Sequence, residues 1–130
     1  MKETMHRGLE IDLHLTPGLK NENFIAEALG NLAAYRLQQE RGEPLQWQVL
    51  RVDEPQHHHF RLVVRHPARP LDLGLVHALR KTLDDLSNES EEELSRRFRE
   101  ARVKGLTPVP LRHIHEAPDL WQDDFWNHLG

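Results

Sequence analysis

The sequence predicts an α+β fold in which helices cover one face of an antiparallel sheet. Three observations lead to this prediction. Residues 9–15 alternate strictly between apolar and polar side chains, residues 45–52 and 60–65 have the composition of strands, and three other segments carry apolar residues at helical spacing. The resulting order is β-α-β-β-α-α with an extended C-terminal tail, and we expect a ferredoxin-like split β-α-β arrangement.

The first strand and the first helix have clear sequence signals. The alternation over residues 9–15 is typical of a strand that is buried on one face only. Asn21 or Asn23 is expected to cap the helix that follows, and Gly42 is expected to end it. The apolar stripe of this helix is predicted to consist of Ile25, Ala28, Leu29, Leu32 and Ala33.

The next two strands, residues 45–52 and 60–65, are expected to form a hairpin. In the first of them the apolar alternation changes phase between Val49 and Leu50. Such a change of phase indicates either a bulge or a strand that is buried on both faces.

Two helices should follow the hairpin, and the first is expected to pack on the same sheet. Its apolar residues at helical spacing are Leu73, Val76, Leu79, Leu83 and Leu86. Ser90 and Glu93 form a capping box that starts a third helix, which ends before Gly105. The apolar seam of the third helix is narrow and consists of Leu94, Phe98 and Ala101. Residues 106–118 contain several prolines and are predicted to be extended, as an edge strand or as a wrapping segment.

The composition indicates a small protein that needs no covalent cross-link. With 130 residues the chain is long enough to bury a core, and we expect a single α+β domain over residues 1–112 with a tail over residues 113–130. The absence of cysteine excludes disulfides, thiol nucleophiles and cysteine-ligated zinc. No secretory signal or membrane-spanning run is recognisable, so the expected location is cytoplasmic, with no membrane partner.

The tail combines large aromatic side chains with all of the excess charge. Four of the 21 acidic residues lie in residues 113–130, which contain no Lys or Arg, so the other 17 acids balance the 17 basic residues. Two of the three tryptophans, Trp121 and Trp126, are also there. Because chain ends are usually polar, such a tail is expected to pack on the body of the protein or on a partner.

We therefore expect a non-enzymatic protein–protein interaction module, a regulator or adaptor, that docks through the tail and a basic third helix. Residues 94–112 carry six basic residues and one acid, which complements the acidic tail. The expected partner-binding residues are Leu120, Trp121, Phe125, Trp126, Arg96, Arg97, Arg99 and Arg102. The partner is another protein or a second copy in a homodimer, and no cofactor is expected.

An enzyme of the hydrolase or nuclease class is the alternative, because ten histidines offer acid–base groups. In the predicted sheet, Glu10 and Asp12 would face Arg61 and Arg65 across the first and third strands, with His14 beside them. No nucleophile elbow or phosphate-binding loop accompanies this group. The catalytic assignment is therefore none.

Metal binding is not expected either, because the histidine spacings lack a complete ligand set. The weak candidates are His57, His59, His113 and His115. Nucleic-acid binding through the arginines of the third helix is a further alternative. It is disfavoured by the acidic net charge and by the lack of aromatic residues at the exposed strand positions.

Overall fold

The computed structural model describes residues 8–15, 20–52, 58–68 and 70–113, and residues 114–130 of the tail lie outside this part of the chain. The elements are β1 (Gly8–His14), α1 (Glu22–Arg41), β2 (Gln46–Arg51), β3 (His59–Arg65), α2 (Leu73–Ser87), α3 (Glu91–Lys104) and β4 (Leu111–His113). The α+β class and the predicted order are confirmed, and residues 106–118 contribute a short edge strand.

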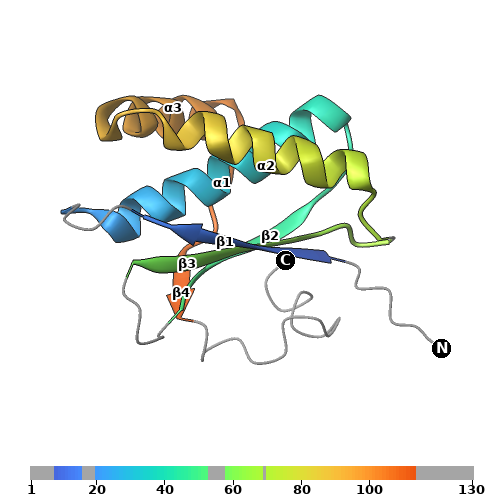
Figure 1. Ribbon diagram of the computed structural model, residues 1–130. Coiled ribbons are helices and arrows are strands. Elements are labelled where there is room, and N and C mark those ends of the chain that lie inside the picture. The colour runs from blue at the N-terminus through green and yellow to red at the C-terminus, as the bar shows by residue number, and fades with distance from the viewer. Residues whose placement is uncertain (1–7, 16–19, 53–57, 69, 114–130) are drawn as a thin grey trace.

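The four strands form a mixed sheet in the order β1-β3-β2-β4 (Figure 1). Both β1 and β2 pair with β3 in the antiparallel direction, which is the predicted split β-α-β arrangement. The short β4 pairs with β2 in the parallel direction. It therefore lies at the β2 edge and makes the sheet mixed rather than purely antiparallel.

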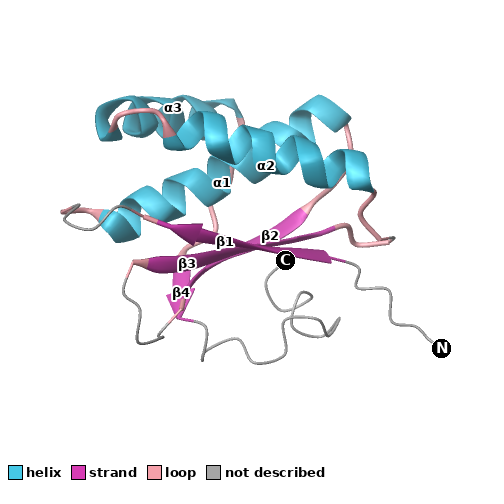
Figure 2. Cartoon of the chain, viewed as in Figure 1, coloured by secondary structure: helices cyan, strands magenta, loops and turns pink. Residues whose placement is uncertain are grey.

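All three helices lie on the same side of the sheet (Figure 2). Helix α1 packs against β2 and β3, whereas most contacts of α2 and α3 are with α1 rather than directly with the sheet. The close approach of α1 depends on Gly30, because a Cβ atom there would lie 2.6 Å from Cγ2 of Val49. The opposite face of the sheet carries no described helix, and we call it the helix-free face.

The predicted helix signals largely match the structure. The stripe of α1 and the seam of α3 are buried, Gly42 ends α1 in the left-handed conformation, and Ser90 Oγ accepts a hydrogen bond from the backbone N–H of Glu93. Asn21 is the N-cap of α1, but its side chain makes no capping bond and donates instead to Glu91. Leu73, which was expected in the apolar stripe of α2, is exposed at the first turn of the helix, and Leu75 is buried there instead.

Asn31 on α1 fixes the extended segment that leads to β4. It is fully buried, and its Nδ2 group donates to the carbonyl oxygens of Glu27 at 2.8 Å and Val109 at 3.0 Å. Its Oδ1 atom accepts from Trp47 Nε1 at 2.9 Å and from the N–H of Val109 at 2.8 Å. One residue therefore ties together α1, β2 and the segment before β4, with donors and acceptors that are all used.

The change of phase in β2 corresponds to burial on both faces. Val49 points towards the helices and Leu50 points to the helix-free face, and neither has exposed surface.

The described helices are all too short or too polar to cross a membrane.

Candidate functional site

The antiparallel pairing of β1 with β3 brings polar residues together on the helix-free face. Asp12 lies opposite Arg61, and two residues further along His14 lies opposite His59. Because alternate residues of a strand point to the same face, all four side chains share this surface. The site is therefore formed where β1 ends and β3 begins.

Asp12, His14 and His59 form a compact group, which we call the histidine cluster. The rings of His14 and His59 are stacked, with centroids 4.4 Å apart and planes 18° apart. One donor atom from each of the three residues lies within 4.8 Å of the other two. Within residues 8–15, 20–52, 58–68 and 70–113 it is the only group of three or more such side chains close enough to hold a metal ion.

His59 is the most buried member of the cluster. Its side chain is 12% exposed, and its Nε2 atom is shielded from solvent. Oδ1 of Asp12 lies 3.1 Å from this nitrogen, but the approach does not have the direction of a hydrogen bond. A buried nitrogen without a directed partner is uncommon in folded proteins and calls for an explanation.

Arg61 holds the carboxylate of Asp12 in place. Its Nε group donates to Oδ1 of Asp12 at 2.9 Å, and Nη1 lies 3.4 Å from Glu10. Burial raises the pKa of Asp12, but the contacts with Arg61 and His59 outweigh burial and leave the pKa below its ordinary value. Asp12 is therefore a carboxylate at neutral pH, as predicted for a residue that faces Arg61.

The side chain of the neighbouring His58 lies towards α1, on the opposite side of the sheet from the histidine cluster. It has a positive φ of 69°, which is rare for a residue other than glycine, and its Nδ1 atom contacts Glu22 at the start of α1. Glu22 also pairs with Arg51 at 3.0 Å. His58 thereby helps to fasten the hairpin to α1, while His59 remains with the cluster on the other face.

Beside the cluster, the helix-free face also carries two buried apolar residues. Leu50 and Val63 lie at its centre, on neighbouring strands, and neither has exposed surface. On the same face by register, Arg112 of β4 lies beside Leu50 and Arg65 lies two residues beyond Val63 on β3, while Arg61 and Gln48 lie opposite Leu50 and Val63. This arrangement is a buried apolar patch flanked by guanidinium groups, on a face without a described helix.

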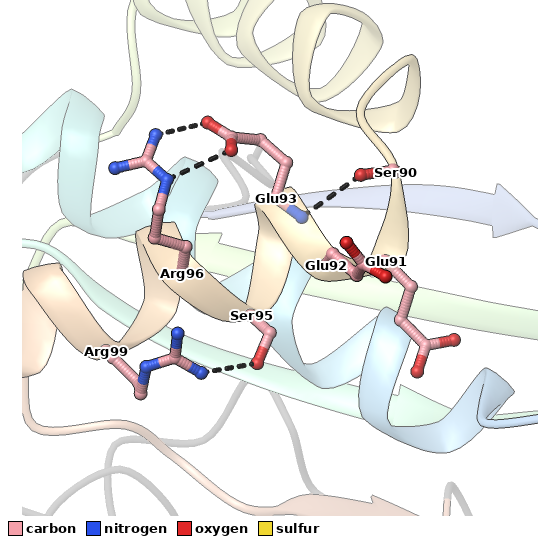
Figure 3. Close-up of a pocket in the computed structure, with 7 residues that line it drawn as sticks. All are labelled: Ser90, Glu91, Glu92, Glu93, Ser95, Arg96 and Arg99. Carbon is pink, nitrogen blue, oxygen red and sulfur yellow. Dashed lines mark hydrogen bonds and ion pairs between the residues drawn. The ribbon is translucent and has the colours of Figure 1, made fainter.

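The predicted basic surface of α3 is largely neutralised by acids. Arg96 contacts both Glu93 and Glu100, and Figure 3 shows it turned towards Glu93. Arg97 pairs with Glu89 at 2.9 Å and with Glu93 at 3.2 Å.

The remaining arginines of α3 are exposed. The Nη1 group of Arg99 donates to Ser95 at 3.1 Å, as Figure 3 also shows, and Arg102 lies near the end of the helix. The four predicted arginines therefore do not form one shared cationic patch, which also weakens the case for nucleic-acid binding.

Most of the other predicted residues lie outside the described part of the chain. These are Leu120, Trp121, Phe125, Trp126, His57 and His115. His113 is the last residue of β4, and of the four weak metal candidates only His59 joins the cluster described above.

The pairing of His14 with His59 was missing from the sequence prediction, although its signal was present. The predicted contact of Asp12 with Arg61 defines a register, and in that register His14 lies opposite His59. The predicted strand begins at residue 60 and therefore leaves His59 in the connection between the two strands of the hairpin. Extending β3 by one residue would have revealed the cluster.

Fold and site together define a small α+β protein whose split β-α-β sheet carries a histidine cluster beside a buried apolar patch. The chain belongs to the family described as "Protein of unknown function (DUF2004)", whose model matches residues 5–129. A comparison with curated proteins finds no match. The matched region includes all of the tail except residue 130.

Proposed function

We propose that the protein is a non-enzymatic interaction module, a regulator or adaptor in the cytoplasm, whose acidic aromatic tail and helix-free face act together. In this proposal residues 114–130 cover the helix-free face in the unbound protein. A partner protein presents a similar acidic aromatic segment and competes for the same surface. The exposed arginines of α3, Arg99 and Arg102, are additional contacts for the partner.

The observation that carries the proposal is the burial of Leu50 and Val63 on a face without a described helix. Apolar side chains in the middle of a sheet are buried only when something lies over them. Tryptophan and phenylalanine suit this role because each buries a large apolar area. The tail carries three such residues, Trp121, Phe125 and Trp126.

The position and length of the tail also support the proposal that the tail covers the helix-free face. It begins directly after β4, whose end points away from the helices (Figure 1). Four strands spaced about 4.8 Å apart span roughly 15 Å, and 17 residues of extended chain reach much further than that. The charge also fits, because the tail carries four acids and the apolar patch is flanked by Arg65 and Arg112.

The test uses full-length protein and a labelled peptide with the sequence of residues 118–130. Replacing Trp121 and Trp126 with alanine weakens the tail without removing it, so the peptide should bind this variant about ten- to hundredfold more tightly than it binds the unchanged protein. Fluorescence anisotropy at low and high salt measures the affinity. Arg112→Glu, added to the double variant, should weaken peptide binding and reduce its salt dependence.

The outcomes separate an interaction module from a purely structural tail. Equal and weak binding of the peptide by both proteins would contradict the proposal. A loss of thermal stability in the double variant without any gain in peptide affinity would show that the tail is only part of the core. Concentration-dependent dimerisation of the double variant would instead identify a second copy of the chain as the partner, which remains within the proposal.

A second candidate function is a small histidine-dependent hydrolase or nuclease. The observation that favours it is the juxtaposition of His14 and His59 with Asp12, since imidazole and carboxylate groups are the usual acid–base pair near neutral pH. Chromogenic phosphodiesters and esters test it directly. Activity that is lost in His14→Ala supports an enzyme, and the absence of turnover removes this candidate.

A further inference from the structure

We propose that Asp12, His14 and His59 bind a divalent transition-metal ion, of which zinc is the best fit. This inference is independent of the proposed interaction function, and it differs from the sequence-based expectation that no metal binds. It rests on the geometry of the histidine cluster, on the buried nitrogen of His59, and on the manner in which Arg61 holds Asp12.

The donor set selects the class of ion. Two imidazoles and one carboxylate are ligands typical of zinc and of other first-row transition metals, whereas calcium and magnesium prefer oxygen ligands alone. Three protein ligands leave a further coordination position for water or another small ligand, as in zinc sites that are open to solvent. Asp12 and His14 are exposed, so an ion can enter from the solvent side.

The distances are close to those that a bound ion requires. Zinc bonds of about 2.0–2.1 Å in a tetrahedral arrangement place neighbouring ligand atoms about 3.3 Å apart. Nε2 of His59 already lies 3.1 Å from Oδ1 of Asp12. The largest separation in the group is at most 4.8 Å. Because a metal ion lies in the plane of each imidazole that binds it, the exposed ring of His14 has to turn out of its stack with His59 to bind the same ion.

The buried nitrogen of His59 is a further observation, because its contact with Asp12 has the distance but not the direction of a hydrogen bond. Without a directed hydrogen bond, a buried polar atom destabilises the folded protein. The imidazole nitrogen of His59 faces a carboxylate oxygen of Asp12 at contact distance, and a cation between them would bind to both atoms.

Arg61 acts on the site as a positioning residue. Both of the contacts of Asp12 described above use the same oxygen, Oδ1, so Arg61 fixes the orientation of the carboxylate. The positive charge of Arg61 opposes a cation, but Asp12 and Glu10 together outweigh it. Zinc binding is therefore expected to be of moderate affinity rather than of the strength found in structural zinc sites.

The test is titration calorimetry of Zn²⁺ into full-length protein purified without a histidine tag and stripped with a chelator. A single ion per chain should bind, and His14→Ala, His59→Ala and Asp12→Asn should each weaken binding at least about tenfold. His77→Ala is the matched control, because His77 is exposed on α2, and its affinity should equal that of the unchanged protein.

A second measurement keeps the proposal testable if His59→Ala fails to fold. The exposed residue His14 is replaced, the fold is checked by circular dichroism, and Co²⁺ is added as a spectroscopic substitute for zinc. Visible absorption bands of a tetrahedral site should appear in the unchanged protein and be absent from His14→Ala. The proposal is overturned if folded His14→Ala binds Zn²⁺ as the unchanged protein does, if no stoichiometric binding occurs, or if replacing His113 and His115 removes the binding instead.

Discussion

The two faces of the sheet differ in how completely their buried polar groups are hydrogen-bonded. On the helix-covered face, the side chain of Asn31 is fully buried and uses every donor and acceptor, in bonds to Trp47, Val109 and Glu27. On the helix-free face, the buried Nε2 atom of His59 has no directed hydrogen bond. A hydrogen-bond network in which every donor and acceptor is used helps to specify the fold. A buried polar atom without such a bond, next to other imidazole and carboxylate groups, instead indicates a site for a ligand.

The strongest test of this contrast is the replacement of Asn31 by alanine. The change leaves the buried indole of Trp47 and the half-buried backbone groups of Val109 without these partners, so the free energy of unfolding should fall by about 3 kcal/mol. Urea denaturation measures the loss. Asn88→Ala is the control, because Asn88 closes α2 through its backbone, and a comparable loss there would contradict the role given to Asn31.

A smaller loss is expected where α1 meets the sheet. Gly30→Ala places a Cβ atom against the stiff, fully buried Val49, and such overpacking typically costs about 1–3 kcal/mol. Gly74→Ala is the matched control, because its Cβ atom would meet only the flexible side chain of Arg41 and the side chain of Asp72. Since alanine also favours the helix, thermal melting should find the Gly74 variant unchanged or more stable. Equal effects at both glycines would argue against close packing at Gly30.

The smallest expected effect concerns Glu22, which contacts His58 but not the adjacent His59 of the cluster. The hydrogen bond with His58, aided by Arg51, holds the pKa of Glu22 below its ordinary value of 4.5 despite the opposing effect of burial. Because the pKa is lowered in the folded protein, Glu22 stabilises the fold above pH 4.5, and this contribution is lost as the pH falls through the lowered value.

Glu22→Gln should therefore cost about 1–2 kcal/mol at neutral pH, and the difference from the unchanged protein should shrink in acid. Chemical denaturation across the acid range measures both quantities. Glu92→Gln, at an exposed position of α3, is the control. A difference between Glu22→Gln and the unchanged protein that grows in acid would contradict the assigned role of Glu22.

Local patterns of side chains were enough to predict most of the fold. The alternation in β1, the apolar stripe of α1 and the cap at Ser90 depend on neighbouring residues, and all are found in the structure. The parallel pairing of β4 was not predictable in this way, because it depends on the contacts of Asn31 with Val109, 78 residues apart. Long-range hydrogen bonds leave no local signal in the sequence.

The candidate site was predictable only in part. The contact of Asp12 with Arg61 followed from charge and strand register, and the same register would have placed His14 beside His59. The basic character of α3 was overestimated, because a count that begins at residue 94 omits Glu89 and Glu93, with which Arg97 pairs. Net charge over a segment does not reveal which charges neutralise one another in space.

The contrast between the two faces is tested most directly by titrating Zn²⁺ into ¹⁵N-labelled protein and following its two-dimensional NMR spectrum. The predicted result is that signals from residues 12–14 and 58–61 shift or broaden, while the indole signal of Trp47 and the side-chain amide signal of Asn31 stay unchanged. The contradictory result is an unchanged spectrum around His14 and His59, or a response that is equally strong at Asn31 and Trp47.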